Sequence, residues 1–151
     1  MTTRPAFVLA LTVAALAAAV AAPAAMSTHT VSSPTLQVKT SRFGKLLFDG
    51  RGFVLYAFTR DKVGGKSTCY GDCAAAWPPY VLKGKRTVAP GLQKTLLGTT
   101  KRLDGKLQVT YAGRPLYYYR GDTKPGYILC QDVFEYGGTW LVVANTGKLV
   151  R

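Results

Sequence analysis

The chain has 151 residues and carries 20 Lys and Arg against 7 Asp and Glu, which gives a formal net charge of +13 at pH 7. This length excludes a large multidomain enzyme, because single domains contain roughly 100–200 residues. The nine Tyr, six Phe and two Trp exclude a disordered protein, since these rings bury enough surface to offset chain entropy. Three Cys and a single His are few ligands for a zinc site of the Cys/His type, so such a site is not expected.

The N-terminal residues have the three parts of an export signal. Arg4 precedes an apolar run over residues 6–22, and the small residues Ala22 and Ala24 fit a cleavage site after Ala24. An uncleaved membrane anchor is the alternative, which the weakly apolar, Ala-rich composition disfavours. No later segment is long and apolar enough to span a membrane. The predicted divisions are a signal peptide (1–24), a flexible leader (25–36) and a folded domain (37–151).

The folded part contains an internal repeat, in which residues 44–69 match residues 105–130. Nine positions of the first stretch are identical to their counterparts in the second, where chance gives roughly one or two. The identical pairs are Gly44/Gly105, Lys45/Lys106, Leu46/Leu107, Gly52/Gly113, Leu55/Leu116, Tyr56/Tyr117, Asp61/Asp122, Gly65/Gly126 and Cys69/Cys130. We therefore predict one domain of two duplicated units, unit one over about 44–82 and unit two over about 105–143, with pseudo-two-fold symmetry.

Each unit is predicted to contain a β-hairpin. The turns are Asp49-Gly50-Arg51-Gly52, between strands 45–48 and 53–59, and Ala112-Gly113-Arg114-Pro115, between strands 106–111 and 116–120. Glycine accepts the positive φ of such turns, and Asp-Gly is a strong hairpin signal. Further strands are expected over 79–82 and 141–143, and one turn of helix within 69–77. The predicted fold class is mostly β, a single domain of two antiparallel β units with at most one or two short helices.

A motif of the form Y-x-[FWY]-x-x-D occurs once in each unit. Its residues are Tyr56, Phe58 and Asp61 in unit one and Tyr117, Tyr119 and Asp122 in unit two. A C-x3-C-A-x-x-W-P-P block that contains Trp77 lies between the copies, and Arg102-Leu103-Asp104-Gly105 precedes the second hairpin. Over about 44–143, these features together resemble the bacterial secreted repeat of unknown function, a family of predicted lipoproteins with a Yx(FWY)xxD motif.

The resemblance implies an exported, envelope-associated domain with no established enzymatic activity. The chain departs from the family pattern in two places. It lacks a cysteine near the signal cleavage region, which argues against a lipid anchor, and it has a further cysteine, Cys130.

The motif side chains have two interpretations. Alternation along a strand places Tyr56 and Phe58 on one face, as it does Tyr117 and Tyr119. They form either a core aromatic layer shared by the units, with hydroxyls bonded to polar partners, or a groove for a ligand with flat or sugar-like faces. Likewise, the two motif aspartates either cap loops or form a carboxylate pair for a metal or for acid–base chemistry. Basic surroundings keep them ionised and disfavour a general acid, so we assign no catalytic residue, metal ligand or cofactor.

Cys69 and Cys73 are the clearest chemical feature. In an exported protein the expected product is a disulfide, and a suitably turned backbone brings residues four apart within reach. A Cys69–Cys130 pair is the alternative, because equivalent positions can meet near a pseudo-two-fold axis; otherwise Cys130 is buried or free for an intermolecular link. A thiol-redox or metal-handling role is the competing function. Copper proteins with this spacing also use a His on the folded domain, whereas His29 lies in the leader.

The densest positive charge lies in the linker between the units. It comprises Lys83, Lys85, Arg86, Lys94, Lys101, Arg102 and Lys106. A solvated face would aid solubility, whereas a binding surface would attract anionic envelope polymers, lipid headgroups or extracellular DNA. The candidate anion-binding residues are Lys83, Lys85, Arg86, Lys101 and Arg102. No nucleic-acid reading motif is present, so sequence-specific recognition is not expected.

The sequence therefore predicts an exported, non-enzymatic domain, periplasmic or secreted. Its expected partner is an anionic envelope polymer, a lipid headgroup or another protein. A small hydrolase is disfavoured because the folded part lacks a His and the G-x-S-x-G motif.

Overall fold

The computed structural model describes residues 1–2 and 35–151. The predicted signal peptide and nearly all of the predicted leader therefore lie outside the described residues. Thr35 and Leu36 are both buried, so the folded domain begins slightly before the expected Gln37. No helix within residues 35–151 is long and apolar enough to cross a lipid bilayer.

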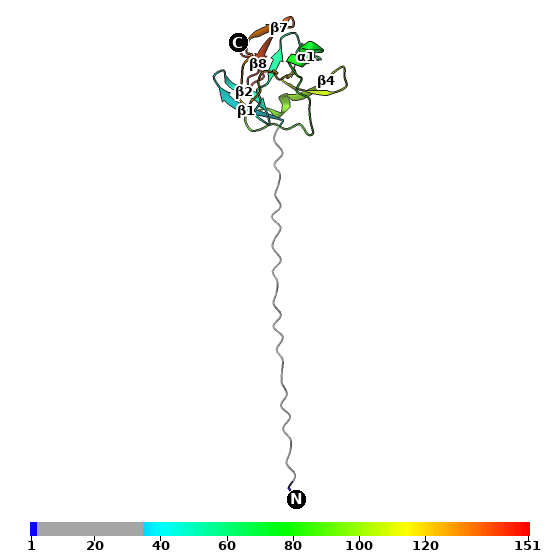
Figure 1. Cartoon of the computed structure of the whole chain (residues 1–151), viewed down its shortest axis with the longest axis vertical. Helices are drawn as coiled ribbons and strands as arrows, with labels where there is room; N and C mark the ends of the chain where they lie inside the picture. Colours follow the sequence, from blue (N-terminus) through cyan, green and yellow to red (C-terminus); the bar gives the residue numbers. More distant parts are fainter. Residues whose placement is uncertain (3–34) are drawn as a thin grey trace. The chain divides into compact units, whose positions relative to one another are not determined.

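Residues 35–151 form short strands joined by loops, with little helix (Figure 1). In chain order the elements are β1 (Leu36–Ser41), β2 (Gly44–Asp49), β3 (Tyr56–Phe58), α1 (Asp72–Ala76), the 3₁₀-helix η1 (Lys94–Leu96), β4 (Leu97–Lys101), β5 (Leu107–Tyr111), β6 (Arg114–Pro115), β7 (Val133–Glu135) and β8 (Gly138–Val142). They make three small antiparallel sheets, ordered β1-β2, β3-β8-β7 and β4-β5-β6. The predicted fold class, mostly β with a short helix, is confirmed.

Both predicted hairpins are present. In unit one, the Asp49 N–H donates to Phe53 O at 2.8 Å across the turn. In unit two the turn is tighter than predicted, because Ala112 and Gly113 both have positive φ, as a two-residue type I′ turn requires. Arg114 and Pro115, predicted as turn residues, therefore form strand β6.

Three strands were not predicted from the sequence. β1 and β4 are equivalent, since the offset that aligns Gly44 with Gly105 also aligns Leu36 with Leu97, and each pairs with the following strand of its own unit. Both units therefore begin before the expected boundaries. β7 pairs with β8 at a sheet edge. All three strands are largely exposed or half-buried, so they lack a strong apolar alternation.

A pseudo-two-fold axis passes between Tyr56 and Tyr117. The backbone N–H of each donates to the carbonyl oxygen of the other, and both bonds are 2.9 Å long. Around this pair the units exchange strands: Tyr56 of β3 pairs with Val142 of β8, and Tyr117 pairs with Pro79 in the equivalent bridge. The end of each unit thus pairs with the hairpin of the other, which makes the two units one domain.

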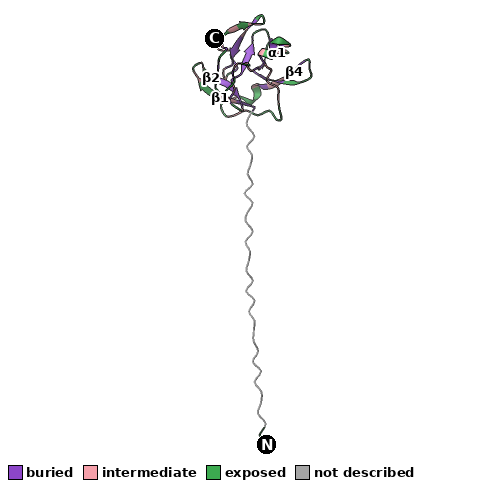
Figure 2. Ribbon diagram, viewed as in Figure 1, coloured by how far each residue is buried: buried purple, intermediate pink, exposed green. Residues whose placement is uncertain are grey.

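Alternate residues of the segment 55–58, which includes β3, and of its counterpart in unit two enter two separate cores. Tyr56, Phe58 and Tyr117 belong to one cluster, whereas Leu55 and Leu116 belong to the other. This is the alternation that the sequence predicts. In Figure 2 the central strands are coloured as buried and the hairpin ends as exposed.

The first core is built on a column of aromatic rings that follows the same symmetry. Trp77 and Trp140 stack at its centre, with ring centroids 4.1 Å apart and planes 4° from parallel. Phe58 stacks on Trp140 at 4.2 Å and Tyr119 packs on Trp77 at 4.7 Å. Each tryptophan therefore packs against a motif ring of the other unit, and the motif aromatics form a shared core layer.

Candidate functional site

The tyrosine and aspartate of each motif bond across the repeat. The Tyr56 hydroxyl donates to Asp122 Oδ2 at 2.7 Å, and the Tyr117 hydroxyl donates to Asp61 Oδ2 at 2.5 Å. Both carboxyl groups are buried. Burial, reinforced by the bonded aspartate, raises the pKa of both tyrosines, so the hydroxyls stay protonated donors.

The second oxygen of each aspartate fixes a loop. Asp61 Oδ1 accepts the Thr68 N–H at 2.7 Å, and Asp122 Oδ1 accepts the Leu129 N–H at 2.9 Å. Thr68 and Leu129 occupy equivalent positions of the repeat, so the two loops are closed in the same way. This is the loop-capping role predicted for the aspartates. Within residues 35–151, no group of three His, Cys, Asp or Glu side chains could hold a metal ion.

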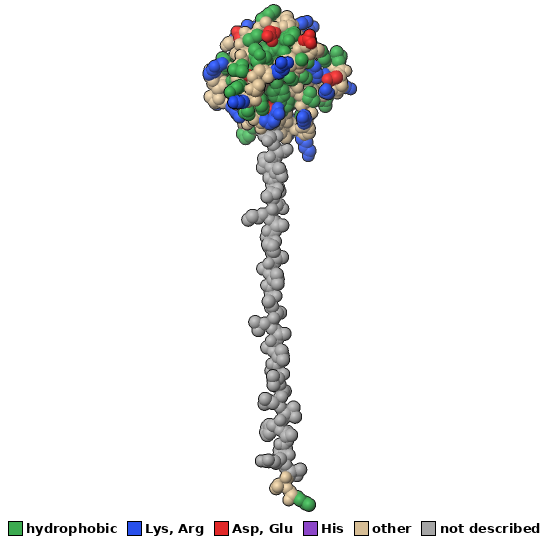
Figure 3. All heavy atoms as spheres, viewed as in Figure 1, with side chains coloured by type: hydrophobic (Ala, Val, Ile, Leu, Met, Phe, Trp, Pro, Cys, Tyr) green, Lys and Arg blue, Asp and Glu red, His purple; other side chains and the backbone are tan. Residues whose placement is uncertain are grey.

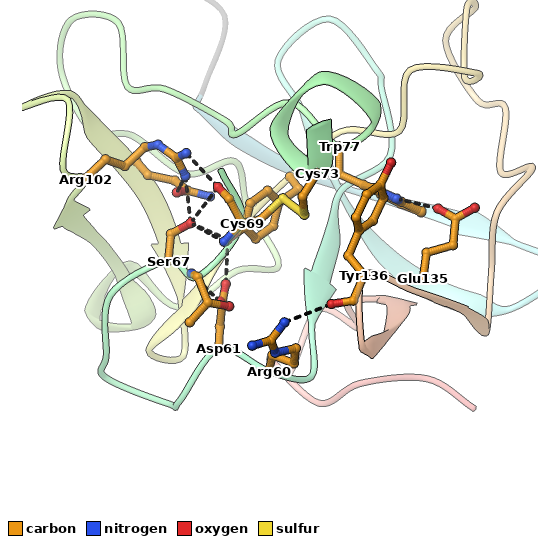
Figure 4. The surroundings of a disulfide bond; sticks show 12 residues. Arg60, Asp61, Ser67, Cys69, Cys73, Trp77, Arg102, Glu135 and Tyr136 are labelled. Atoms are coloured by element: carbon orange, nitrogen blue, oxygen red, sulfur yellow. Dashed lines mark hydrogen bonds between the residues drawn. A yellow bond between two sulfur atoms is a disulfide. The ribbon is translucent and has the colours of Figure 1, made fainter. Parts of the chain in front are cut away.

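Arg102 does not lie on a basic surface, which corrects its assignment as an anion-binding residue. Its side chain is buried, and polar groups accept hydrogen bonds from both terminal nitrogens of the guanidinium, whereas Nε is buried without a partner among the described residues. Nη1 donates to Ser67 Oγ at 2.7 Å and to Gln108 Oε1 at 2.8 Å, and Nη2 donates to Cys69 O at 2.8 Å (Figure 4). The guanidinium also lies over the Tyr70 ring, 4.3 Å from its centroid.

Arg102 is linked to Asp61 through two hydroxyls. Ser67 Oγ accepts from Arg102 and lies 2.7 Å from the Tyr117 hydroxyl, which itself donates to Asp61. A buried cation and a buried carboxylate therefore compensate each other through a continuous chain of hydrogen bonds.

The symmetry-related site around Asp122 has no such chain among the described residues. Ile128 stands at the position equivalent to Ser67, and Ser41 at the position equivalent to Arg102. Asp122 is therefore buried with hydrogen-bond donors and without the linked cation. Burial raises the pKa of its carboxyl group, although the bonds from Tyr56 and Leu129 oppose that shift.

The cysteines are paired as the sequence favoured. Cys69 and Cys73 form a disulfide with their Cα atoms 5.3 Å apart, and helix α1 supplies the turned backbone. Because the loop is short, its chain-entropy contribution to stability is only about 2 kcal/mol. Cys130, at the position equivalent to Cys69, is buried and free. Burial raises the pKa of its thiol.

A cleft of about 630 Å³ lies between the first hairpin turn and the linker. Arg51 lines it from the turn, Lys83 and Lys85 from the linker, and Tyr80 and Tyr118 from the paired segments of the two units. It thus combines cations with aromatic rings at a place where both units contribute.

The two tyrosine rings of the cleft are held in place by their hydroxyls. Tyr80 donates to Thr35 O at 2.7 Å, and Tyr118 donates to Asp49 Oδ2 at 3.0 Å. The rings are 5.2 Å apart and inclined by 58°. Burial raises the pKa of Tyr80 to about 12 and also raises that of Tyr118, so both rings stay neutral.

The cleft has an excess of positive charge. Asp49 is the carboxylate among its lining residues, and all of its bonds go to neighbours of the turn and to Tyr118. Arg51 forms an ion pair with it at 3.0 Å, yet 70% of the Arg51 side chain stays exposed. Lys83 and Lys85 are exposed and have no ion-pair partner among the described residues. Figure 3 shows Lys and Arg side chains spread over the visible face, with few acidic ones.

The predicted anion-binding residues are therefore divided by the structure. Lys83 and Lys85 line the cleft, Arg86 follows them in the same exposed loop, and Lys101 is exposed at the end of β4 outside the cleft. Sequence reasoning missed Arg51, Tyr80 and Tyr118 as cleft residues. For Tyr118 a signal exists, because alternation places it on the face opposite Tyr117 and Tyr119.

The comparison with protein families agrees with the duplicated architecture. The model for the secreted repeat of unknown function matches residues 37–80 and 98–144, more than half of the chain. The chain belongs to this family. Each matched segment of the secreted repeat contains one hairpin, one tyrosine motif and one core tryptophan, and the linker with Lys83 and Lys85 lies between them. No curated protein and no solved structure matches the chain.

The disulfide predicts a defined thiol count. When the protein is unfolded in denaturant without reductant, alkylation should modify one cysteine, Cys130, and after reduction it should modify three. Intact mass gives both counts directly. In the folded protein Cys130 should react slowly because it is buried. Three modified cysteines without reductant would contradict the Cys69–Cys73 bond.

Arg102→Met should lower the free energy of unfolding by about 3–5 kcal/mol, because it leaves a buried carboxylate and several acceptors without their cation. Urea unfolding measures this difference. Lys101→Met is the matched control at the exposed neighbour and should change stability by no more than about 0.5 kcal/mol. Equal effects of the two substitutions would show that Arg102 has no special structural role.

Asp122→Asn should change how stability depends on pH. Because the pKa of Asp122 is raised by folding, its favourable contribution is present in acid and is lost as pH rises through the folded pKa. The stability of Asp122→Asn relative to wild type should therefore increase as pH rises above about 4, the ordinary pKa of an aspartate, as measured by urea unfolding. Asp104→Asn is the control with the opposite sign, since the backbone N–H of Lys106 lowers the pKa of Asp104. If the stability of both variants relative to wild type changed with pH in the same direction, the raised pKa of Asp122 would be refuted.

Proposed function

We propose that this secreted domain is non-enzymatic and binds an anionic envelope polymer in the cleft of Arg51, Tyr80, Lys83, Lys85 and Tyr118. The observation that carries the proposal is the convergence of three exposed cations on two fixed tyrosine rings in one hollow. The cations would contact phosphate, sulfate or carboxylate groups, and the ring faces would pack on sugar-like rings.

The size of the cleft supports a polymer segment of a few residues as the ligand. Its volume lies in the range of sites that hold small molecules, so the rest of the polymer would extend into solvent. A family of secreted proteins meets such polymers outside the cytoplasm, in a periplasmic or an extracellular location. The proposal holds for either location.

The motif carboxylates support a binding role over a catalytic one. Asp61 and Asp122 are buried, bonded to tyrosines and loop amides, and absent from the cleft. The thiol-redox alternative receives no support from the cysteines, because Cys69 and Cys73 are both buried in the aromatic core. An acidic segment of a protein partner is the competing occupant of the cleft.

Neutralising the cleft cations should weaken binding of a sulfated dextran. Lys83→Gln combined with Lys85→Gln should raise the Kd roughly tenfold at low ionic strength, and the effect should shrink with added salt. Isothermal titration calorimetry measures the Kd and its dependence on salt. Lys94→Gln combined with Lys148→Gln removes the same charge from exposed positions outside the cleft and should have little effect.

Two further probes separate charge from ring recognition. Polyphosphate carries charge without rings and unsulfated dextran carries rings without charge, so both should bind more weakly than sulfated dextran. If both double variants lost the same affinity for sulfated dextran, or if polyphosphate and sulfated dextran bound equally well, the interaction would be unspecific charge attraction. No binding of any probe at low salt would leave the protein partner as the favoured ligand.

A further inference from the structure

A second hollow, of about 420 Å³, lies between the β1-β2 hairpin and the loop over residues 126–129. It shares no lining residue with the cleft. Phe48, Tyr127 and Leu129 give it apolar walls, and Lys39 and Arg42 line it from the hairpin. It therefore joins an apolar interior to a cationic edge.

The duplication explains why this hollow exists beside the loop over residues 126–129. Ser41 and Ile128 line it, and they stand at the positions equivalent to Arg102 and Ser67. At the symmetry-related place the long Arg102 side chain of unit two is buried against Ser67 of unit one, whereas here the short Ser41 side chain lines the hollow together with Ile128. A buried polar contact at one of the two related places thus corresponds to an apolar recess at the other.

The apolar side chains of the hollow are held in an exposed position. Leu129 is 62% exposed and Tyr127 is 40% exposed. The Leu129 N–H donates to the buried Asp122, and Arg42 Nη2 donates to Ile128 O at 3.2 Å. The loop is therefore fixed by its backbone to the core, and the leucine is presented to solvent by a rigid support.

The surroundings of these side chains are cationic. Lys39 and Arg42 are exposed, and the Lys124 ammonium lies 6.0 Å from the Tyr127 ring centroid. None of the described residues that line the hollow carries a carboxylate. A hydrophilic polymer would satisfy the cations, but it would leave the exposed leucine without a favourable contact.

The geometry points to the surface of an anionic lipid bilayer as the partner of this face. Leu129 and Tyr127 enter the boundary between headgroups and acyl chains, while Lys39, Arg42 and Lys124 contact lipid phosphates. Both contributions are needed, because one leucine buries little area and each cation adds only modest attraction to an anionic surface. This interaction is separate from polymer binding in the cleft.

Co-sedimentation with vesicles tests the charge contribution. Full-length protein should bind vesicles of phosphatidylglycerol and phosphatidylcholine, and bind vesicles of phosphatidylcholine alone much less. Lys39→Gln combined with Arg42→Gln should lower the partition coefficient roughly 25-fold, about fivefold for each charge. Lys94→Gln combined with Lys148→Gln is the control for net charge, and all variants keep the same N-terminal residues.

Leu129→Ser tests the apolar contribution and should lower the partition coefficient roughly fivefold. Leu103→Ser is its matched control, since Leu103 is 79% exposed and lies outside the hollow. Lys83→Gln combined with Lys85→Gln should keep vesicle binding even where it loses sulfated dextran. Equal binding of the Leu129 and Leu103 variants, or dependence on Lys83 and Lys85 instead of Lys39 and Arg42, would overturn the proposal.

Discussion

The reciprocal bonds between the two tyrosine motifs hold the rest of the domain in place. Tyr56 and Tyr117 bond to each other through their backbones, and each hydroxyl reaches the motif aspartate of the opposite unit. These aspartates then close one loop each, so a single set of polar contacts ties together both hairpins and both loops. A carboxylate left unpaired in the core would lower the free energy of unfolding by several kcal/mol. Each copy of the motif therefore depends on the other.

The two units keep this shared centre and differ around it. Unit one has a disulfide and a helix where unit two has a free cysteine and strand β7, and unit two has the buried Arg102 where unit one has Ser41. Duplication gives each surface segment a second copy, and a substitution outside the shared centre changes one copy while the core stays intact. The cleft and the hollow both lie where the copies have diverged or where the linker joins them.

Much of the fold follows from the sequence, because the internal repeat and the two hairpin turns are patterns that can be read directly along the chain. The pairing of Cys69 with Cys73 follows from their spacing in the same way. The burial of Arg102 cannot be predicted from the sequence, because its acceptors at Ser67 and Cys69 are distant in the chain. A cation next to Lys101 is expected at the surface. The cleft was missed for the same reason, because Arg51 and Tyr118 meet only after the two units have paired.

The exchange of strands has a consequence for how the chain reaches its native state. β3 lies near the start of the folded part, whereas its partner β8 lies near the end of the chain. The first unit therefore lacks its sheet partner until almost the whole chain is available, and contacts of such long range slow folding. A polypeptide that crosses a membrane N-terminus first would stay open during transit and close only when its last strand emerges. In such a chain the order of the strands would delay folding until transit is nearly complete.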